Sequence, residues 1–544
     1  MIAILALAII VIEINKCKTL ARTNMKLNTK NRFISFIMMM LVTILMTACG
    51  DSEDDVGTVK TSGSQEDLVS ISVAINGSQA VPSLQTKPTA TGSITVDKNS
   101  GNISGSVDVS NLKDNNNVTA MHIHMGKPGE TGGPIITFQM EGNDNNRWMV
   151  PENSMLNATD LSMLLQGDTY INVHTTEVGS GQIRGQILPS DKELTVSDLS
   201  GKEQIPTEIS SNLTATGYTT FNSSTNRIDV RVNISDTSAV TAIHIHNASF
   251  GNNGQIVLPL DADTSGNTSY SASMDLSSEL VDAYQRGNLY FNLHTTNNPT
   301  GELRGQILPS DVFVSKTTLS GEQQIPTVIA SDGSANAYIT VDKNNNTLSG
   351  IVRYFNLTDV TAAHIHNAYA GENGAVAFPF ELMGNDTLEL NGTLNADALA
   401  KLLRGEFYIN LHTSTNMAGE LRGQIIPENI LLVRSLLDSD QVTQEVSSSS
   451  SGIAYTTVNE TSGDLISNLN LFDIENVSAI HIHDGVSGMT GDIVVPLQSV
   501  NENSWKATST LDAIALEKFK TAGLYYNVHT TTYPKGEIRG QINP

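Results

Sequence analysis

The sequence predicts an all-β protein made of four tandem domains, each with one short helix. One set of phrases occurs four times, in steps of 122, 120 and 117 residues. Gly, Ser, Thr and Asn are abundant and aromatic residues make up only 5% of the chain, a turn-rich composition typical of β-proteins. Apolar and polar residues alternate along the repeated phrases, which is the period of a strand. Each unit is long enough to bury its own core.

The repeats set the domain boundaries. We predict repeat one at residues 68–191, repeat two at 192–311, repeat three at 312–430 and repeat four at 431–544. Short proline-bearing links between them favour a semi-rigid string of domains. One helix is expected in each repeat, ahead of a glycine that ends it; the predicted helices are 161–166, 277–286, 397–404 and 512–522. In repeat one, Thr159 or Asp160 is the expected cap.

The residues before the repeats predict an exported, lipid-anchored protein. An apolar run at 33–48 follows Lys26, Lys30 and Arg32; it is short for a membrane span and has the shape of a signal peptide. The run ends at Cys49 in a context that resembles the lipobox of bacterial lipoproteins, which implies lipidation of Cys49. We expect residues 1–49 to be a signal region, with the true start at Met25, and 50–67 to be a flexible acidic tether.

Charge and cysteine content exclude some classes of function. The formal net charge is -25 and the isoelectric point is near 4.7. This argues against nucleic acid as a partner, because phosphate binding needs basic patches. Cys17 and Cys49 both precede the repeats, so no disulfide lies within the repeated region. No Ser-His-Asp arrangement, phosphate loop or paired-carboxylate signature indicates a catalytic site.

Histidines follow one pattern in all four repeats. A phrase Ala-x-His-x-His is followed by a phrase Tyr-x-Asn-x-His, and an arginine stands ten residues after the third histidine. The chain has 12 histidines, and the pattern uses all of them: His122, His124, His174, His244, His246, His294, His364, His366, His412, His481, His483 and His529. Such regularity favours a site, although duplication of one ancestral domain would also produce it.

Alternation along strands puts the polar groups of these phrases on one face. Side chains two residues apart share a face, so His122 and His124 lie together, opposite Met121 and Ile123. The polar set in the later strands is expected to surround the third histidine as second-shell or anion-binding residues; it comprises Tyr170, Asn172, Arg184, Tyr290, Asn292, Arg304, Tyr408, Asn410, Arg422, Tyr525, Asn527 and Arg539. We expect each arginine to lie near the third histidine of its repeat.

Two interpretations of the histidines stay open. In one, the three imidazoles of each repeat bind copper or zinc, since neutral imidazole suits both metals, and the arginine attracts an anion or supports the ligands. In the other, the histidines belong to a polar network that fixes the sheet.

Taken together, these phrases resemble the CHRD domain, named from chordin. The resemblance lies in Gln-x-x-Pro at the opening of a repeat, Ala-x-His-Ile-His, Tyr-x-Asn-x-His-Thr, and Gly-Glu-Leu-Arg-Gly-Gln-Ile at 301–307, and covers about residues 68–544. It implies an extracellular β-sandwich-type domain without a settled activity. Repeat one departs from the pattern, with Gln182 where the others have Glu302, Glu420 and Glu537. His-Ile-His with a later arginine also resembles the copper-binding strand of copper/zinc superoxide dismutase, but without a bridging histidine.

These observations predict a cell-envelope lipoprotein at the outer membrane or cell surface, displaying four CHRD-like domains. The leading hypothesis is a non-enzymatic binding or structural array for an extracellular protein or glycan, in which linked copies give avidity. The alternative is a metal-binding protein, copper or zinc, that uses the histidine triads and is redox-active in one version of this hypothesis.

Overall fold

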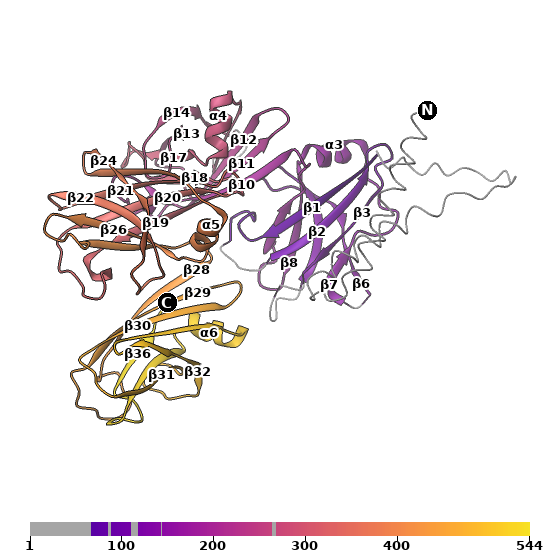
Figure 1. Ribbon diagram of the computed structural model, residues 1–544. Helices are drawn as coiled ribbons and strands as arrows, with labels where there is room; N and C mark the ends of the chain where they lie inside the picture. Colours follow the sequence, from indigo (N-terminus) through magenta and orange to yellow (C-terminus); the bar gives the residue numbers. More distant parts are fainter. Residues whose placement is uncertain (1–66, 85–88, 110–111, 113–117, 143, 264–267) are drawn as a thin grey trace, which may run out of the picture. The chain divides into compact units, whose positions relative to one another are not determined.

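The computed structural model describes residues 67–84, 89–109, 112, 118–142, 144–263 and 268–544. The predicted signal region, the lipidation site Cys49 and nearly all of the predicted tether lie outside the described residues. In the described part, each repeat consists of antiparallel strands and one α-helix (Figure 1). The all-β prediction with one helix per repeat is therefore confirmed.

The four repeats contain the same strands and one α-helix in the same order, and repeats two and three also contain a short 3-10 helix (η). Repeat one has β1 (Leu68–Asn76), β2 (Thr89–Asp97), β3 (Ile103–Asp108), β4 (Val118–Met125), β5 (Pro134–Thr137), β6 (Gln139–Glu141), β7 (Asp144–Met149), α3 (Ala158–Gln166), β8 (Thr169–Thr175) and β9 (Ile183–Gln186). Repeat two has β10 (Lys192–Leu199), η3 (Gly201–Glu203), β11 (Ala215–Asn222), β12 (Arg227–Ile234), β13 (Val240–Asn247), β14 (Gln255–Pro259), β15 (Asp261–Ala262), β16 (Ser269–Asp275), α4 (Ser278–Gln285), β17 (Leu289–Thr295) and β18 (Leu303–Ile307).

Repeats three and four continue this order. Repeat three has β19 (Val312–Leu319), η4 (Gly321–Gln323), β20 (Ser334–Asp342), β21 (Thr347–Phe355), β22 (Val360–Asn367), β23 (Ala375–Pro379), β24 (Glu381–Gly384), β25 (Thr387–Thr393), α5 (Ala396–Leu403), β26 (Phe407–Thr413) and β27 (Leu421–Ile425). Repeat four has β28 (Ile430–Leu437), β29 (Ser451–Asn459), β30 (Asp464–Phe472), β31 (Val477–Asp484), β32 (Ile493–Pro496), β33 (Gln498–Asn501), β34 (Ser504–Thr510), α6 (Ala513–Lys520), β35 (Leu524–Thr530) and β36 (Ile538–Ile542).

Two sheets pack face to face in repeats two, three and four, and two halves of one sheet do so in repeat one. In repeat two a five-stranded sheet runs β10-β11-β12-β16-β15 and a four-stranded sheet runs β14-β13-β17-β18. Repeats three and four have the same orders, and in Figure 1 β28, β29 and β30 of repeat four lie in one layer and β31, β32 and β36 in the other. In repeat one the pair Asn76↔Arg184 links the two halves into one nine-stranded sheet. This is the sandwich architecture in which inward-facing side chains of both sheets form one core.

The apolar half of the predicted alternation forms that core. In repeat one, Met121 and Ile123 of β4 and Ile171 and Val173 of β8 are fully buried against residues of the opposite sheet. Each repeat has its own core cluster of this kind. Burial of a Val, Leu or Ile side chain stabilises a fold by about 1.5–3 kcal/mol, so these strands hold the histidine face in place from behind.

The cap of α3 differs from the sequence-based expectation. Helix α3 begins three residues earlier than expected, because the side chain of Asn157 accepts hydrogen bonds from the backbone of Thr159 and Asp160. Helix α5 is capped by Asn395. Asn is as good an N-cap as Asp or Ser, so the expected caps Thr159 and Asp160, which lie inside α3, were the wrong choice. Ser277 and Asp512 cap α4 and α6.

Candidate metal centre

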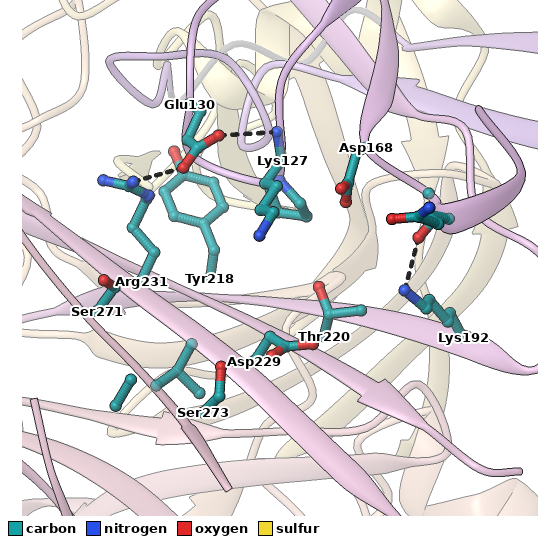
Figure 2. A pocket seen from close by; sticks show the side chains of 15 residues that line it. Lys127, Glu130, Asp168, Lys192, Tyr218, Thr220, Asp229, Arg231, Ser271 and Ser273 are labelled. Carbon is teal, nitrogen blue, oxygen red and sulfur yellow. Dashed lines mark hydrogen bonds and ion pairs between the residues drawn. The ribbon is translucent and has the colours of Figure 1, made fainter. Parts of the chain in front are cut away.

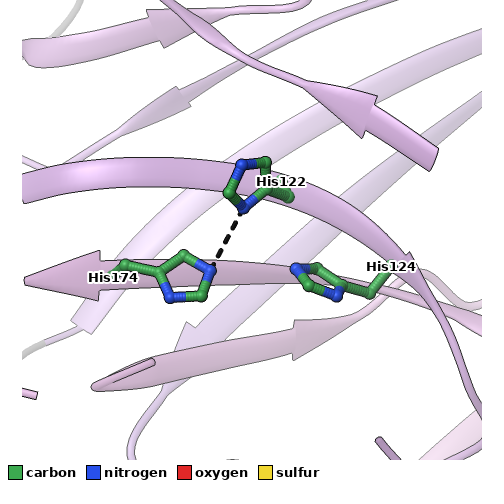
Figure 3. Close-up of side chains that lie close together, drawn as sticks. All are labelled: His122, His124 and His174. Carbon is green, nitrogen blue, oxygen red and sulfur yellow. Dashed lines mark hydrogen bonds between the residues drawn. The ribbon is translucent and has the colours of Figure 1, made fainter. Parts of the chain in front are cut away.

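Strand pairing brings the three histidines of each repeat together. In repeat one β4 pairs with β8, so that Ala120 faces His174, His122 faces Asn172 and His124 faces Tyr170 across the ladder. The small side chain of Ala120 leaves room for the ring of His174 to reach the ring of His122. Figure 3 shows a nitrogen of each of these rings directed at the other, with His124 beside them.

Three ring nitrogens converge in every repeat. One ligand atom from each histidine lies within 4.8 Å of the other two, in all four triads. Nδ1 of His122 is 3.1 Å from Nε2 of His174. The equivalent distance is 3.2 Å for His244 and His294 and 3.2 Å for His364 and His412. Ligand nitrogens about 2.0–2.1 Å from one zinc ion in a tetrahedral site are separated by roughly 3.3 Å, so these separations match a shared metal ion.

Backbone carbonyls fix the tautomers of two histidines. Nδ1 of His124 donates to the carbonyl of Gly132 at 2.8 Å, and Nδ1 of His174 donates to the carbonyl of Gly179 at 2.9 Å. A carbonyl only accepts, so Nδ1 bears the proton and Nε2 of each neutral ring keeps its lone pair. The other repeats repeat both contacts at 2.9–3.0 Å. Metal-bound histidines are held by this kind of partner on the second ring nitrogen.

The same nitrogen, Nε2 of the second histidine, is buried without a partner among the described residues in every triad. Nε2 of His124 has no hydrogen-bond partner among the described residues, and the same holds for its three equivalents, His246, His366 and His483. A buried polar atom left unsatisfied costs about 1–3 kcal/mol. Its recurrence at one position in four repeats makes this atom a candidate ligand atom.

The surroundings of eight histidines favour the neutral imidazole. Burial lowers the pKa of His122 and His124 below the ordinary value, and neighbouring histidines lower it further. Burial is also the first cause of the lowered pKa of His244, His246, His366, His412, His481 and His483. A neutral imidazole has the lone pair that metal binding requires.

Tyrosine and arginine form a stack beside the second histidine. The ring of Tyr170 stacks on His124 with an interplanar angle of 16°, and the Arg184 guanidinium lies 3.5 Å from the Tyr170 ring centroid. Since β8 lies between β4 and β9, the tyrosine separates the histidine from the arginine. All four repeats contain this stack. The arginine therefore lies against the tyrosine, whereas the strand pattern led us to expect it near the third histidine.

A loop explains where the arginine points. We call the segment after each His-x-His strand the site loop: residues 126–133, 248–254, 368–374 and 485–491. Arg184 is buried and donates to the carbonyls of Lys127 and Glu130 and to the side chain of Gln186, which in turn donates to the carbonyl of Gly126. Burial lowers the pKa of Arg184 to about 10, so it stays charged at neutral pH. The guanidinium binds carbonyls of the site loop and so holds this loop in place. The same loop supplies the carbonyl of Gly132 that accepts from His124.

Comparison with known sequences found a family model and one known protein that match this chain. A CHRD domain model matches the chain four times, at residues 71–187, 195–307, 315–425 and 433–542. The chain belongs to the CHRD-domain family. Chordin from Xenopus laevis is 26% identical over 185 residues, which is 31% of this chain and 19% of that protein. Four CHRD domains indicate a binding or structural repeat protein.

The asparagine of the site and a glutamine of the opening phrase, two residues before its proline, support each other. Gln204 donates to the side chain of Asn292 at 2.8 Å, and Gln324 donates to Asn410 at 2.7 Å. Each asparagine also donates to the carbonyl of the residue before the next glycine, as Asn292 does to Thr300. The asparagine therefore orders the hairpin after the third histidine. Sequence reasoning placed Asn292 near the site but missed Gln204, which lies far away in the chain.

The carboxylate that differs in repeat one belongs to the same hairpin. Glu302 accepts hydrogen bonds from Thr295, Asn298 and Ser211. Burial raises the pKa of Glu302, but these hydrogen bonds outweigh burial and the pKa lies below the ordinary value. In repeat one Gln182 donates to Glu177. The substitution therefore changes a hairpin contact and leaves the three nitrogens of the CHRD site in place.

A separate pocket lies between the first two CHRD repeats. It has a volume of about 340 Å³, and its lining mixes cations such as Lys127 and Lys192 with acids such as Asp168 and Asp229 (Figure 2). None of its lining residues is a histidine. Among the helices of the described residues, none is long and apolar enough to cross a membrane.

Proposed function

We propose that each CHRD repeat binds one copper or zinc ion through its three histidines, and that the chain is a lipid-anchored array of four such sites in the cell envelope. In repeat one the ligand atoms are Nδ1 of His122, Nε2 of His124 and Nε2 of His174. The equivalent atoms of the other repeats complete the set. Tyr170, Asn172 and Arg184, whose arrangement recurs in all four repeats, support these ligands.

The observation that carries this proposal is the buried Nε2 atom of the second histidine. Its Nδ1 proton is committed to a carbonyl in every repeat, and its Nε2 has no partner among the described residues. A metal ion between the three nitrogens satisfies this atom together with the other two. Three imidazoles without a carboxylate or thiolate favour zinc or copper over magnesium or calcium, which prefer oxygen.

A structural network is the second candidate. A separation of 3.1 Å between His122 and His174 is also a normal hydrogen-bond length. In that case the triads would fix the sheets, and the chain would act as a non-enzymatic array for an extracellular protein or glycan. The network leaves Nε2 of His124 unsatisfied, which is why we favour the metal.

Metal content distinguishes the two candidates. The chain from residue 50 onward, without an affinity tag, is stripped with a chelator, loaded with zinc or copper, desalted and measured by mass spectrometry. We expect four ions per chain, one for each triad. Replacing His364 and His366 by alanine lowers the content to three ions and leaves the other repeats folded.

Met417→Ala is the matched control. The carbonyl of Met417 accepts from His412, but its side chain is 80% exposed, and the equivalent residues in other repeats are Gly179, Pro299 and Pro534. This variant should keep four ions. A wild-type chain that retains no metal after loading would make the histidines structural and overturn the proposal.

A further inference from the structure

Consecutive repeats are joined through the site loop. The site loop of repeat one packs on the five-stranded sheet of repeat two, where a Cβ added at Gly129 would lie 2.7 Å from a ring carbon of Tyr218. Asn233 donates to the carbonyl of Gly129 at 2.8 Å. Arg231 pairs with Glu130 at 2.6 Å, beside Tyr218 in Figure 2. A tyrosine ring thus covers a bare glycine, and a polar side chain donates to its carbonyl.

The next two joints are built in the same way. Between repeats two and three, Tyr338 lies against Gly251, and Arg353 donates to the carbonyl of Gly251. Between repeats three and four, Tyr455 lies against Gly371. There, Asn468 donates to the carbonyl of Ala370 and Asn470 to that of Gly371. The three tyrosines are only 2–4% exposed, so each is covered by the preceding repeat.

The site loop of repeat four has the same conformation without a joint. Gly488 keeps a positive φ of 78°, as Gly129 does, but no atom of the described residues lies within 4 Å of the position of its Cβ. Arg539 donates to the carbonyls of Val486 and Met489, so the loop is held as firmly as the others. Val486 and Met489 are 54% and 60% exposed. The position of Glu130 and Glu372, which form ion pairs in their joints, is the apolar Met489 here.

Repeat one differs from the other three repeats on the corresponding sheet face. In repeat one, Ser93 occupies the strand position that is a tyrosine in the other repeats (Tyr218, Tyr338 and Tyr455). Ser93 pairs with Ser106 on the neighbouring strand, whereas Tyr218 pairs with Arg231. Ser93 is exposed on a face with Ser72 and Thr91. A polar outer face is typical of a terminal repeat that receives no neighbour. Repeat one therefore has a polar surface on the sheet face that contacts a site loop in the other repeats, whereas repeat four presents a preformed apolar loop.

We propose that residues 485–491 dock on the sheet of a CHRD-type domain in another protein, one that carries a tyrosine where Tyr218, Tyr338 and Tyr455 stand. The loop offers what the three internal joints use: a bare glycine for the ring and the carbonyls of Ser487 and Gly488 for side-chain donors. A second copy of this chain lacks a suitable face, because its three tyrosines are already covered and its first repeat has Ser93.

The chain itself provides the probe. Ser93→Tyr, Ser106→Asn and Asp108→Asn together place on repeat one the receiving set of repeat four, which is Tyr455, Asn468 and Asn470. All three positions lie on the solvent side of their strands, which favours an intact fold. This triple variant of residues 50–544 then carries both a tyrosine face and the loop of repeat four. Light scattering measures its molar mass up to about 1 mM, the effective concentration scale of linked partners.

We expect the triple variant to form head-to-tail oligomers whose mass rises with concentration, while the wild type stays monomeric. Met489→Glu with Val486→Asp, both exposed positions, should return the triple variant to a monomer without changing its thermal unfolding. A folded triple variant that stays monomeric throughout would overturn the proposal. Self-association of the wild type that the loop substitutions abolish would overturn it too, since the partner would then be a second copy.

Discussion

At the scale of single residues, the tyrosine beside the second histidine connects the ligand to its support. Tyr408 stacks on His366 and carries Arg422 on its ring, and its hydroxyl accepts from the backbone of Gly374 at 3.2 Å. Alternation predicted that Tyr408 and His366 share a face, and both do. It could not predict that Arg422 turns to the site loop, because that choice depends on carbonyls some fifty positions away in the chain.

Removing only the hydroxyl separates the two functions of this tyrosine. Tyr408→Phe keeps the stack and loses one hydrogen bond, at a cost of about 0.5–1.5 kcal/mol in the free energy of unfolding. Tyr408→Ala also loses the ring between His366 and Arg422. We expect the first variant to retain four metal ions and the second to lose the ion of repeat three, measured by urea unfolding and metal analysis. Equal metal loss in both variants would contradict this assignment.

The glutamate of the third-histidine hairpin gives an acid-dependent stability. Hydrogen bonds from Thr413, Ser331 and Asn416 outweigh burial and lower the pKa of Glu420. A carboxyl with a lowered folded-state pKa stabilises the fold above its unfolded-state pKa of about 4.3, and this stability is lost as pH falls through the folded value.

Glu420→Gln therefore removes an acid-sensitive contribution. The variant should be less stable than wild type at pH 7, and the difference should shrink as pH falls below about 4.3. Urea unfolding at several pH values measures it. Gln182, which occupies this position in repeat one, shows that the amide fits. A difference that grows on acidification would have the wrong sign for this account.

At the scale of elements, capping and joints are where sequence reasoning fell short. Thr159 and Asp160 precede the apolar run of α3, but Asn157 is the residue with extended backbone geometry that the first turn needs. Cap identity depends on where the chain enters the helix, which the preceding strands decide. Asn395→Ala in α5 should cost about 1 kcal/mol, measured by thermal unfolding, whereas a similar change at exposed Asp397 should cost less.

Two equivalent glycines, Gly371 inside a joint and Gly488 outside one, allow the contribution of a joint to stability to be measured. Gly371 and Gly488 have φ of 86° and 78°, so alanine at either position is strained by roughly 1–2 kcal/mol. Only at Gly371 would the new Cβ meet another repeat, 2.9 Å from a carbon of Tyr455. Gly371→Ala should therefore destabilise the chain more than Gly488→Ala in urea unfolding. Equal losses would mean that the joint contributes little.

At the scale of the whole molecule, the repeat spacing was enough to predict four β-domains, because each unit contains a complete set of inward-facing residues such as Ile365 and Leu411. The links were expected to determine how the domains connect. The structure adds direct joints through Tyr218, Tyr338 and Tyr455. The sequence does contain one sign of these joints, because Ser93 in repeat one replaces the tyrosine of the other three repeats. This difference can be interpreted only when the loop that covers each tyrosine is known.

Anchoring is a prediction for the intact chain in its cell. Cys49 lies in the lipobox-like segment, outside the described residues. Lipidation would hold the array at the membrane, and Cys49→Ser should move the protein from the membrane fraction to the soluble fraction, measured by fractionation and immunoblotting. Cys17→Ser should leave the distribution unchanged. Persistence of the Cys49 variant in the membrane fraction would argue against lipid anchoring.

The most direct test of the central claim is X-ray absorption spectroscopy on the metal-loaded chain, which reports the atoms bound to the metal. The account predicts three imidazole nitrogens at about 2.0–2.1 Å for zinc. In a variant that keeps the histidines of the third triad only, the further substitution His364→Ala should reduce this number to two. A first shell of oxygen atoms without imidazole scattering would contradict the claim, and the twelve histidines would then serve the fold alone.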